Sequence, residues 1–322
     1  MADTNIQGVF GGFDVRSRQL AGTWVTNAYT PPLVAAVWFG GGVSLSTVDR
    51  LTISTDTDTA SVRGPLSAAS QYIAATGNAS YGWWAGRLPA NSNVDRITFN
   101  NDSVAASIRG PITASVYGLA AVTSQTASYF AGGYKRTTVD RITLSNDTVA
   151  ATIVGSLPTP GSQNSAGVSD STSYGWMTAG INSGVVYSTL VRITYASDTT
   201  TASSRGTLSV GRYSFAASFN TSYGWYGGGT TIPGQTSIVD RLTYTTDTAV
   251  ASARGPLLSN RFNHAAGGDT NVGYFGGGYN PFPVQTTSSI TKITYATDTA
   301  TSVDVGSRSV AARRIGGTSG GY

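Results

Sequence analysis

One short phrase, V-D-R followed by an aliphatic residue, returns six times along this chain at nearly constant spacing. The copies begin at Val48, Val94, Val139, Leu190, Val239 and Ile290; the fourth reads Leu-Val-Arg-Ile, and the last is altered to Ile-Thr-Lys-Ile. An aspartate follows each copy, and a glycine follows each aspartate: Asp56, Asp102, Asp147, Asp198, Asp247 and Asp298, then Gly64, Gly110, Gly155, Gly206, Gly255 and Gly306. Self-similarity at roughly 45–50 residues is typical of propeller blades, so the repeat predicts a ring of similar β-sheets.

The composition also favours an all-β chain. The 322 residues include no glutamate and no cysteine, charged residues make up 11%, and Thr, Ser, Ala and Gly are abundant. Most strong helix formers are therefore scarce, while β-branched and small residues are common. Without cysteine, the fold needs no oxidising compartment.

Each repeat divides into four segments that resemble the strands of a blade. An aromatic-glycine segment such as 38–42 comes first, followed by the V-D-R run, a Thr/Ala/Ser/Val strand and a small-residue segment such as 72–75. We expect the aromatic residues to pack on a neighbouring sheet and the alanines to line the narrow centre of the ring. The repeated aspartate lies in a polar turn, where we expect its side chain to hydrogen-bond its own backbone.

The prediction is one domain over residues 1–322, a single all-β propeller with six complete repeats over 21–306 and terminal closing strands in 1–20 and 307–322. Residues 14–18 resemble 304–308, and 315–317 match an innermost strand. Two closures remain open. A hairpin at 9–14 builds a seventh, incomplete blade shared by the termini, or six blades close and the terminal strands are surplus. Completion of the closing blade by a neighbouring chain is a further hypothesis.

Nearly all length variation falls between the aromatic segment and the V-D-R run, as insertions at 181–188, 230–237 and 279–288. Insertions confined to one loop of a repeat map to one face, which is often the binding face. Apolar loop tips with no packing role favour a protein partner. The predicted partner-binding residues are Tyr279, Asn280, Pro281, Phe282, Pro283, Thr231, Ile232 and Pro233.

The aromatic pair before Gly-Gly, closest at Tyr274-Phe275-Gly276-Gly277, resembles kelch-like propellers, although the fourth strand lacks their usual tryptophan. The wording VDRITxxxDTxxASxRGPL with SYGWxGGG is similar to repeats in virion proteins of tailed phages, particularly those of cyanobacteria. The resemblance covers about residues 20–310. It implies a non-enzymatic virion structural protein, in a tail, fibre or capsid appendage, whose partners are other virion proteins and whose loops also serve host attachment.

The beginning of the chain, Met1–Gln7, has neither a basic region nor an apolar core typical of a signal peptide. No apolar run approaches membrane-spanning length. We therefore expect synthesis in the host cytoplasm, incorporation into the virion and no membrane insertion. An oligomer is compatible with these features.

The sequence offers little for catalysis or cofactor binding. His264 is the only histidine, and it occupies an innermost-strand position where the other repeats place residues such as Leu119 or Phe215. We expect a packed core histidine, no metal and no cofactor, since zinc sites need Cys or His clusters. A carbohydrate-active enzyme is the weakest alternative, because the aspartates outside the repeat fall on no motif: Asp3, Asp14, Asp58, Asp170, Asp269 and Asp304.

The repeated V-D-R charges have two interpretations. An arginine ring gripping an anion in the central channel is one. The other, which we favour, places each arginine between blades, paired with aspartate and carbonyl groups. These structural residues are Asp49, Arg50, Asp95, Arg96, Asp140, Arg141, Arg192, Asp240 and Arg241. The net charge is only +4 and no basic cluster stands out, so we expect no nucleic-acid binding.

Three tyrosines recur just before the aromatic segment, at Tyr81, Tyr174 and Tyr223. An exposed tyrosine ring can stack on a sugar, although burial between blades is the competing role. They are the candidate glycan-binding residues for the alternative function, a receptor-binding, lectin-like adhesin that recognises a host surface glycan.

Overall fold

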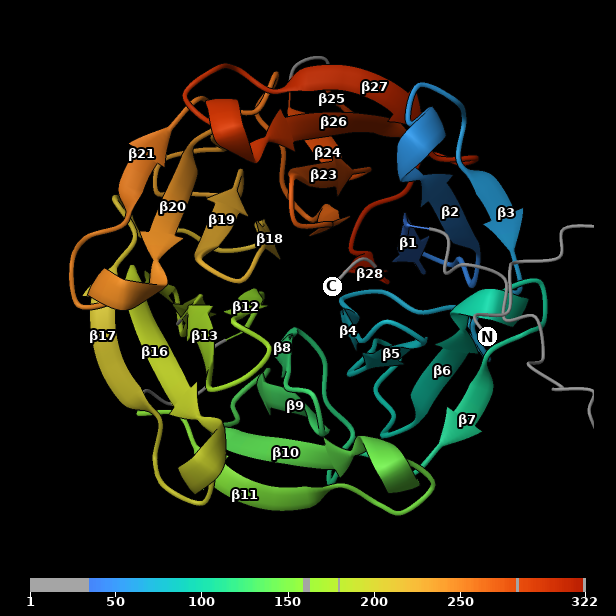
Figure 1. Ribbon diagram of the computed structural model, residues 1–322, viewed down its shortest axis with the longest axis vertical. Coiled ribbons are helices and arrows are strands. Elements are labelled where there is room, and N and C mark those ends of the chain that lie inside the picture. The colour runs from blue at the N-terminus through green and yellow to red at the C-terminus, as the bar shows by residue number, and fades with distance from the viewer. Residues whose placement is uncertain (1–34, 159–162, 179, 282–283, 321–322) are drawn as a thin grey trace, which may run out of the picture. The chain divides into compact units, whose positions relative to one another are not determined.

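The computed structural model of the protein describes residues 35–158, 163–178, 180–281 and 284–320. Within these ranges, six four-stranded antiparallel sheets surround a central axis as the blades of a propeller (Figure 1). The expected all-β propeller is therefore confirmed. All the described residues belong to one compact unit. The strands predicted in 1–20 lie outside the described residues.

The blades follow the sequence repeats. The strands of each blade are given below in spatial order, from the innermost to the outermost. Blade 1 contains β28 (Gly316–Ser319), β1 (Ala36–Gly40), β2 (Val48–Thr52) and β3 (Ser61–Arg63). Blade 2 contains β4 (Ala74–Gly77), β5 (Tyr81–Ala85), β6 (Val94–Thr98) and β7 (Ser107–Arg109). Blade 3 contains β8 (Leu119–Thr123), β9 (Ala127–Gly132), β10 (Thr138–Thr143) and β11 (Thr152–Ser156).

The second half of the ring repeats this order. Blade 4 contains β12 (Gly167–Ser169), β13 (Tyr174–Thr178), β16 (Thr189–Thr194) and β17 (Ser203–Thr207). Blade 5 contains β18 (Ala216–Phe219), β19 (Tyr223–Gly227), β20 (Val239–Thr243) and β21 (Ser252–Arg254). Blade 6 contains β22 (Ala265–Gly268), β23 (Val272–Gly276), β26 (Ser289–Thr294) and β27 (Val303–Ser307).

The ring is closed by the C-terminal strand. β28 pairs antiparallel with β1, with Gly40 opposite Gly316 and Val37 opposite Ser319. Because the repeat begins with a second strand, the first repeat lacks its own innermost strand, and β28 supplies it. The expectation that terminal strands of a six-bladed ring are surplus is therefore wrong for β28. No neighbouring chain is needed to complete blade 1.

The hydrophobic core lies between blades. Six clusters of buried residues each combine side chains from two adjacent blades. The aromatic strands are buried along their length, as in β1, where all five residues are buried. Aromatic rings stack across the interfaces, with ring centroids 3.9 Å apart for Trp38 and Phe99 and 3.7 Å apart for Trp225 and Tyr295. The expected blade-to-blade packing of the aromatic segment is thus observed.

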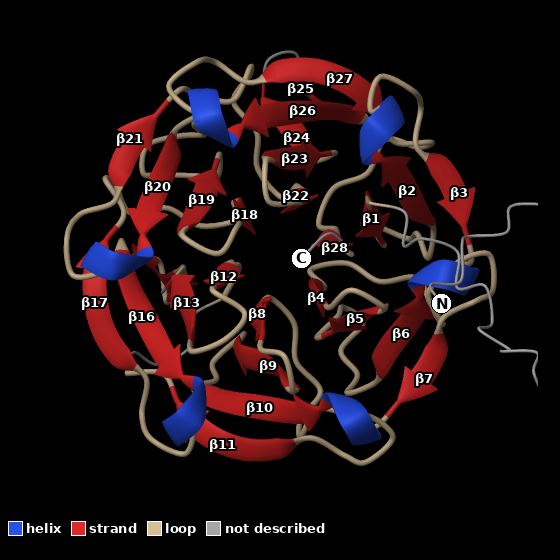
Figure 2. Cartoon of the chain, in the orientation of Figure 1, coloured by secondary structure: helices blue, strands red, loops and turns tan. Residues whose placement is uncertain are grey.

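The propeller has two distinct faces. A short 3-10 turn follows the third strand of each blade (Figure 2): Ile53–Thr55, Phe99–Asn101, Leu144–Asn146, Tyr195–Ser197, Tyr244–Thr246 and Tyr295–Thr297. We call the face with these turns the turn face. The opposite face, the loop face, carries the connections between second and third strands and the links between blades. All three insertions belong to it, including the hairpins β14 (Ile181–Asn182) with β15 (Val185–Val186) and β24 (Tyr279–Pro281) with β25 (Val284–Thr286).

Candidate functional site

The repeated turn aspartate binds the preceding blade. Asp102 of blade 2 accepts hydrogen bonds from the indole Nε1 of Trp38, at 2.8 Å, and from the guanidinium of Arg50, at 3.2 Å, both in blade 1. We call this arrangement the aspartate clamp. It recurs at all six interfaces, with Asp102, Asp147, Asp198, Asp247, Asp298 and Asp56 as the acceptors.

The prediction that this aspartate accepts a hydrogen bond from its own backbone is therefore wrong. The carboxylate reaches the adjacent blade, where an ionised acceptor meets charged and neutral donors in a largely buried space. The local turn role belongs instead to residues between the first and second strands. Asp170 and Asp269 there accept bonds from backbone N–H groups two to four residues further on, as Asn78 and Asn220 do.

The repeated glycine belongs to the same interface. A Cβ placed on Gly64 would lie 1.9 Å from the carbonyl oxygen of Val104 in blade 2, and one on Gly206 would lie 1.9 Å from that of Ala249 in blade 5. The two backbones approach closely enough for Gly64 N–H to donate to the Asp102 carbonyl at 2.7 Å. Only glycine permits this approach, which explains why the residue recurs.

The V-D-R aspartates form a second set of ion pairs, on the loop-face side of the blades. Asp95 pairs with Arg87 at 2.9 Å, and both side chains are fully buried. The equivalent pairs are Asp49 with Arg308, Asp140 with Arg136, and Asp240 with Arg212. Blades 4 and 6 have Val191 and Thr291 at this position. In blade 6 the buried Arg261 donates to the Phe275 and Ser289 carbonyls instead.

These contacts place the V-D-R charges in structural roles. Arg50, Arg96, Arg141, Arg192 and Arg241 each bind an aspartate of the next blade. None of them is among the residues that line the central channel, which are small or apolar for most of its length. The arrangement is therefore the inter-blade pairing that the sequence favoured over an arginine ring in the channel.

The predicted partner-binding residues separate into exposed and packed groups. Ile232 is 74% exposed at the tip of the second insertion, and Pro233 is exposed beside it. Tyr279 is half-buried, with its ring 5.3 Å from Phe262 and the Arg313 guanidinium 5.0 Å from its centroid. Asn280 is half-buried, Pro281 is buried and Thr231 is half-buried. Phe282 and Pro283 lie outside the described residues.

The three candidate glycan-binding tyrosines lie on the turn face, away from the insertions. Each ring has an arginine guanidinium 4.2–4.5 Å from its centroid: Arg96 over Tyr81, Arg192 over Tyr174 and Arg241 over Tyr223. Tyr223 also lines a cavity of about 480 Å³ with residues that include Trp225 and Asn271. One ring face of each tyrosine is therefore covered, and Tyr223 has a cavity large enough for a sugar ring beside it.

His264 lies in the wall of the channel. It is 4% exposed, and its ring centroid is 6.0 Å from that of Phe275. Burial, reinforced by the nearby charge of Arg261, lowers the pKa of the imidazole to about 3, so the side chain is neutral at physiological pH. This environment fits a packed core residue.

Two further findings concern metal and membrane chemistry in the described part of the chain. Its His, Cys, Asp and Glu side chains form no group of three that could hold a metal ion. None of its helices has the length and apolar character of a membrane span. The described aspartates outside the repeat are distributed over blades 1, 4 and 6, at Asp58, Asp170, Asp269 and Asp304.

No pattern in the sequence indicated the mouth of the channel on the loop face. One residue from each blade link lies there, immediately before or near the innermost strand, and all six have a left-handed backbone with φ between 56° and 72°: Tyr72, Gly118, Asn164, Ser214, Asn263 and Arg314. The N–H of each donates to the carbonyl of the preceding one at 2.6–3.0 Å, and Tyr72 N–H donates to the Arg314 carbonyl. We call this closed circle of six backbone hydrogen bonds the mouth ring.

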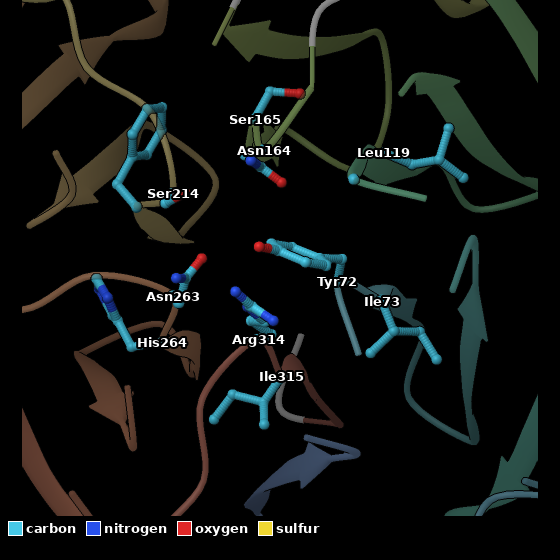
Figure 3. Close-up of a pocket in the computed structure, with 12 residues that line it drawn as sticks. Tyr72, Ile73, Leu119, Asn164, Ser165, Ser214, Asn263, His264, Arg314 and Ile315 are labelled. Carbon is cyan, nitrogen blue, oxygen red and sulfur yellow. The ribbon is translucent and has the colours of Figure 1, made fainter. Parts of the chain in front are cut away.

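Figure 3 shows the side chains of Tyr72, Asn164, Asn263 and Arg314 pointing toward one another across the mouth. The opening narrows to a cavity of about 60 Å³, which has Ile73, Leu119, Phe215 and Ile315 in its wall. The six mouth-ring positions lie outside the repeated phrase and carry five different residue types, so sequence periodicity alone gave no signal for them.

The sequence matches no protein-family model and shows no significant similarity to a curated protein. The class that the fold defines is thus a six-bladed β-propeller, and any narrower assignment rests on the residues themselves.

Proposed function

We propose that the chain is a non-enzymatic structural protein of a tailed-phage virion, a kelch-like propeller that displays its loop face for docking to other virion proteins. The observation that carries the proposal is the placement of the insertions. The insertions project from one face, and the tip of one of them carries Ile232, whose side chain is 74% exposed. A large apolar side chain on a loop tip gains most when a partner covers it.

The rest of the fold supports a display role. Aspartate clamps at all six interfaces and the pairing of β28 with β1 hold the blades in a closed ring. A closed ring leaves no long sheet edge for unintended pairing, and a rigid scaffold fixes the positions of its loops. Variation in the loops can then change the partner without changing the ring.

Immunogold labelling of intact phage particles tests the location. One antibody recognises the 279–288 insertion, and a second recognises the outer strands of the repeat. We expect the second antibody to label particles and the first to label only dissociated protein, because docking covers the loop face. Absence of both labels from particles would contradict the virion assignment.

A pair of variants tests the docking surface directly. Ile232→Asp places a charge on the insertion, whereas Val303→Asp places one on the outer strand β27, where the native side chain is 53% exposed. We expect Ile232→Asp to abolish incorporation into particles and Val303→Asp to leave it intact. Equal incorporation of both variants would argue against docking through this insertion.

Glycan recognition is the second candidate function. Of the three candidate tyrosines, Tyr223 is the favoured site, because it has a cavity beside it. Trp225, Asn271 and Asn220 line the same cavity, so aromatic and amide groups lie close together, as sugar binding requires. Tyr223→Ala should abolish saturable glycan binding, and Tyr81→Ala is the matched control. If both variants bind glycan like the wild type, the turn-face site is ruled out.

A further inference from the structure

The mouth ring keeps side chains where the backbone favours glycine. Gly118 occupies one of its six positions, so glycine is compatible with the ring. The other five positions carry side chains at φ values of 56–62°, which L-residues adopt rarely and at an energetic penalty. Such conformations cluster at binding sites, where the side chain has a function that offsets the strain.

The mouth is positively charged. Among the described residues that line it, Arg314 is the only one that is charged at neutral pH, since His264 is neutral there, and none is a carboxylate. The Arg314 guanidinium donates to the side-chain oxygen of Gln71 at 2.8 Å, a neutral partner that leaves its charge in place. Arg261 lies behind the wall in blade 6, where Thr291 replaces the aspartate that pairs with the equivalent arginine in blades 1 and 5, and the charge of Asp304 acts on it instead. An anion is therefore the ligand that the local potential favours.

The mouth also offers unused hydrogen-bonding groups. The hydroxyls of Tyr72 and Ser214 and the amides of Asn164 and Asn263 make no side-chain hydrogen bond to the described residues. Hydroxyl and amide groups can both donate and accept, which matches the hydroxyls of a sugar. The mouth ring consumes its own backbone N–H and C=O groups, so these do not remain for pairing with a peptide main chain.

We infer that the mouth ring binds an acidic saccharide, a sugar that carries a carboxylate. The carboxylate pairs with the guanidinium of Arg314, and the amides of Asn164 and Asn263 bond the ring hydroxyls. The cavity at the mouth, about 60 Å³, is too small for a sugar ring, so the sugar lies above it and only its acidic group enters. The inference goes beyond the proposed function, because this saccharide site lies on the loop face and is separate from the turn-face cavity beside Tyr223.

Isothermal titration of the full chain tests the ligand class. The acidic probes are N-acetylneuraminic acid and glucuronic acid, which distinguish the two common sources of a sugar carboxylate. The matched neutral probes are N-acetylglucosamine and glucose, and a short aspartate-containing peptide represents a protein ligand. We expect saturable binding of at least one acidic sugar, at least tenfold tighter than that of either neutral sugar, and weaker with added salt.

Variants of adjacent arginines test the site. Arg314→Asn removes the charge but keeps a residue that tolerates a positive φ, and Arg313→Asn removes the neighbouring charge, which lies over Tyr279. We expect Arg314→Asn to weaken acidic-sugar binding at least tenfold and Arg313→Asn to leave it unchanged. Asn263→Gly, which removes the amide without straining the backbone, should weaken binding severalfold. Thermal unfolding of each variant verifies that the ring is intact.

Three results would overturn the inference: no saturable binding of any acidic sugar, equal binding of acidic and neutral sugars, or unchanged binding by Arg314→Asn. Tighter binding of the peptide than of either acidic sugar would replace the saccharide by a protein ligand. The Ile232→Asp test of virion docking uses a residue outside the mouth and a different readout, so failure of one proposal leaves the other measurable.

Discussion

Four of the six blade interfaces are built differently from the other two. At interfaces 1/2, 2/3, 4/5 and 5/6, a tryptophan and two arginines of one blade approach the clamp aspartate of the next. Asp247, for example, contacts Trp176, Arg192 and Arg205. At interfaces 3/4 and 6/1 a tyrosine replaces the tryptophan and a single cation remains, so Asp198 has Tyr129 with Arg141, and Asp56 has Tyr274 with Lys292.

The missing cation has a simple cause in sequence. The outer arginine stands just before the repeated glycine in four blades, whereas blades 3 and 6 carry the identical triplet Val-Gly-Ser at 154–156 and 305–307. Arg141 is also the most exposed of the clamp arginines, at 37% of its side chain. The ring therefore consists of two three-blade halves, joined by two weaker interfaces three blades apart. The link that carries the chain from β27 of blade 6 to β28 of blade 1 crosses one of these interfaces.

Removing the clamp aspartate should give the largest difference between the two kinds of interface. We expect Asp247→Ala to lower the free energy of unfolding by about 3–5 kcal/mol, because it leaves two arginines and an indole N–H without their acceptor. Asp198→Ala should lower it by only about 1–2 kcal/mol, because the single arginine there is partly in water. Urea unfolding of both variants measures the pair. Equal losses would show that the second arginine contributes nothing.

Low pH should lower the free energy of unfolding through His264, which lies beside the channel at the interface of blades 5 and 6. Its folded-state pKa of about 3 lies below the ordinary value of 6.5, so between these values the unfolded chain binds the additional proton. Stability contributed by the neutral imidazole is complete above pH 6.5 and falls by about 1.4 kcal/mol per pH unit below it.

His264→Leu, which copies Leu119 of blade 3, should remove this slope. Unfolding free energies measured at half-unit steps from pH 7 to pH 5 provide the check, because most carboxylates remain ionised there. The same slope in the variant would assign the acid sensitivity to the clamps instead.

Adding a methyl group at the repeated glycine should destabilise the two kinds of interface to different extents, with a smaller difference than that expected for the aspartate variants. A Cβ on Gly206 would lie 1.9 Å from a carbonyl oxygen of blade 5, whereas one on Gly155 would lie 2.6 Å from a carbonyl oxygen of blade 4. We expect Gly206→Ala to lose about 3 kcal/mol and Gly155→Ala about 1 kcal/mol, within the range for overpacked sites. Thermal and urea unfolding should agree on the order, and a larger loss for Gly155→Ala would contradict it.

Restoring the missing arginine should have the smallest effect. Val154→Arg places a second cation beside Asp198 and should raise the free energy of unfolding by at most about 1 kcal/mol, as half-exposed ion pairs do. The matched control is Ile153→Arg, which adds the same charge on an outward side chain that is 57% exposed. A gain in the control equal to that in Val154→Arg would mean that no clamp had been formed.

The sequence predicted the parts of the fold that depend on local chemistry. The number of repeats, the order of four strands in each blade, the buried aromatic strand and the single site of insertion all follow from patterns within one repeat. The pairing of arginine between blades also followed, because so many repeated charges need internal partners. The insertions share one face, as predicted, but periodicity could not indicate that Ile232 is exposed whereas Pro281 is buried.

The tertiary structure determined which side chains and backbone groups of different blades bond to each other. Trp38 and Asp102 are separated by 64 residues, and nothing near Asp102 in sequence shows that its carboxylate reaches another blade rather than its own turn. The mouth ring likewise exists only because six links meet around one axis, and β28 completes blade 1 only because the ring brings both ends of the propeller together. A repeat determines what each blade is. The curvature of the closed ring determines which groups of different blades come within hydrogen-bonding distance.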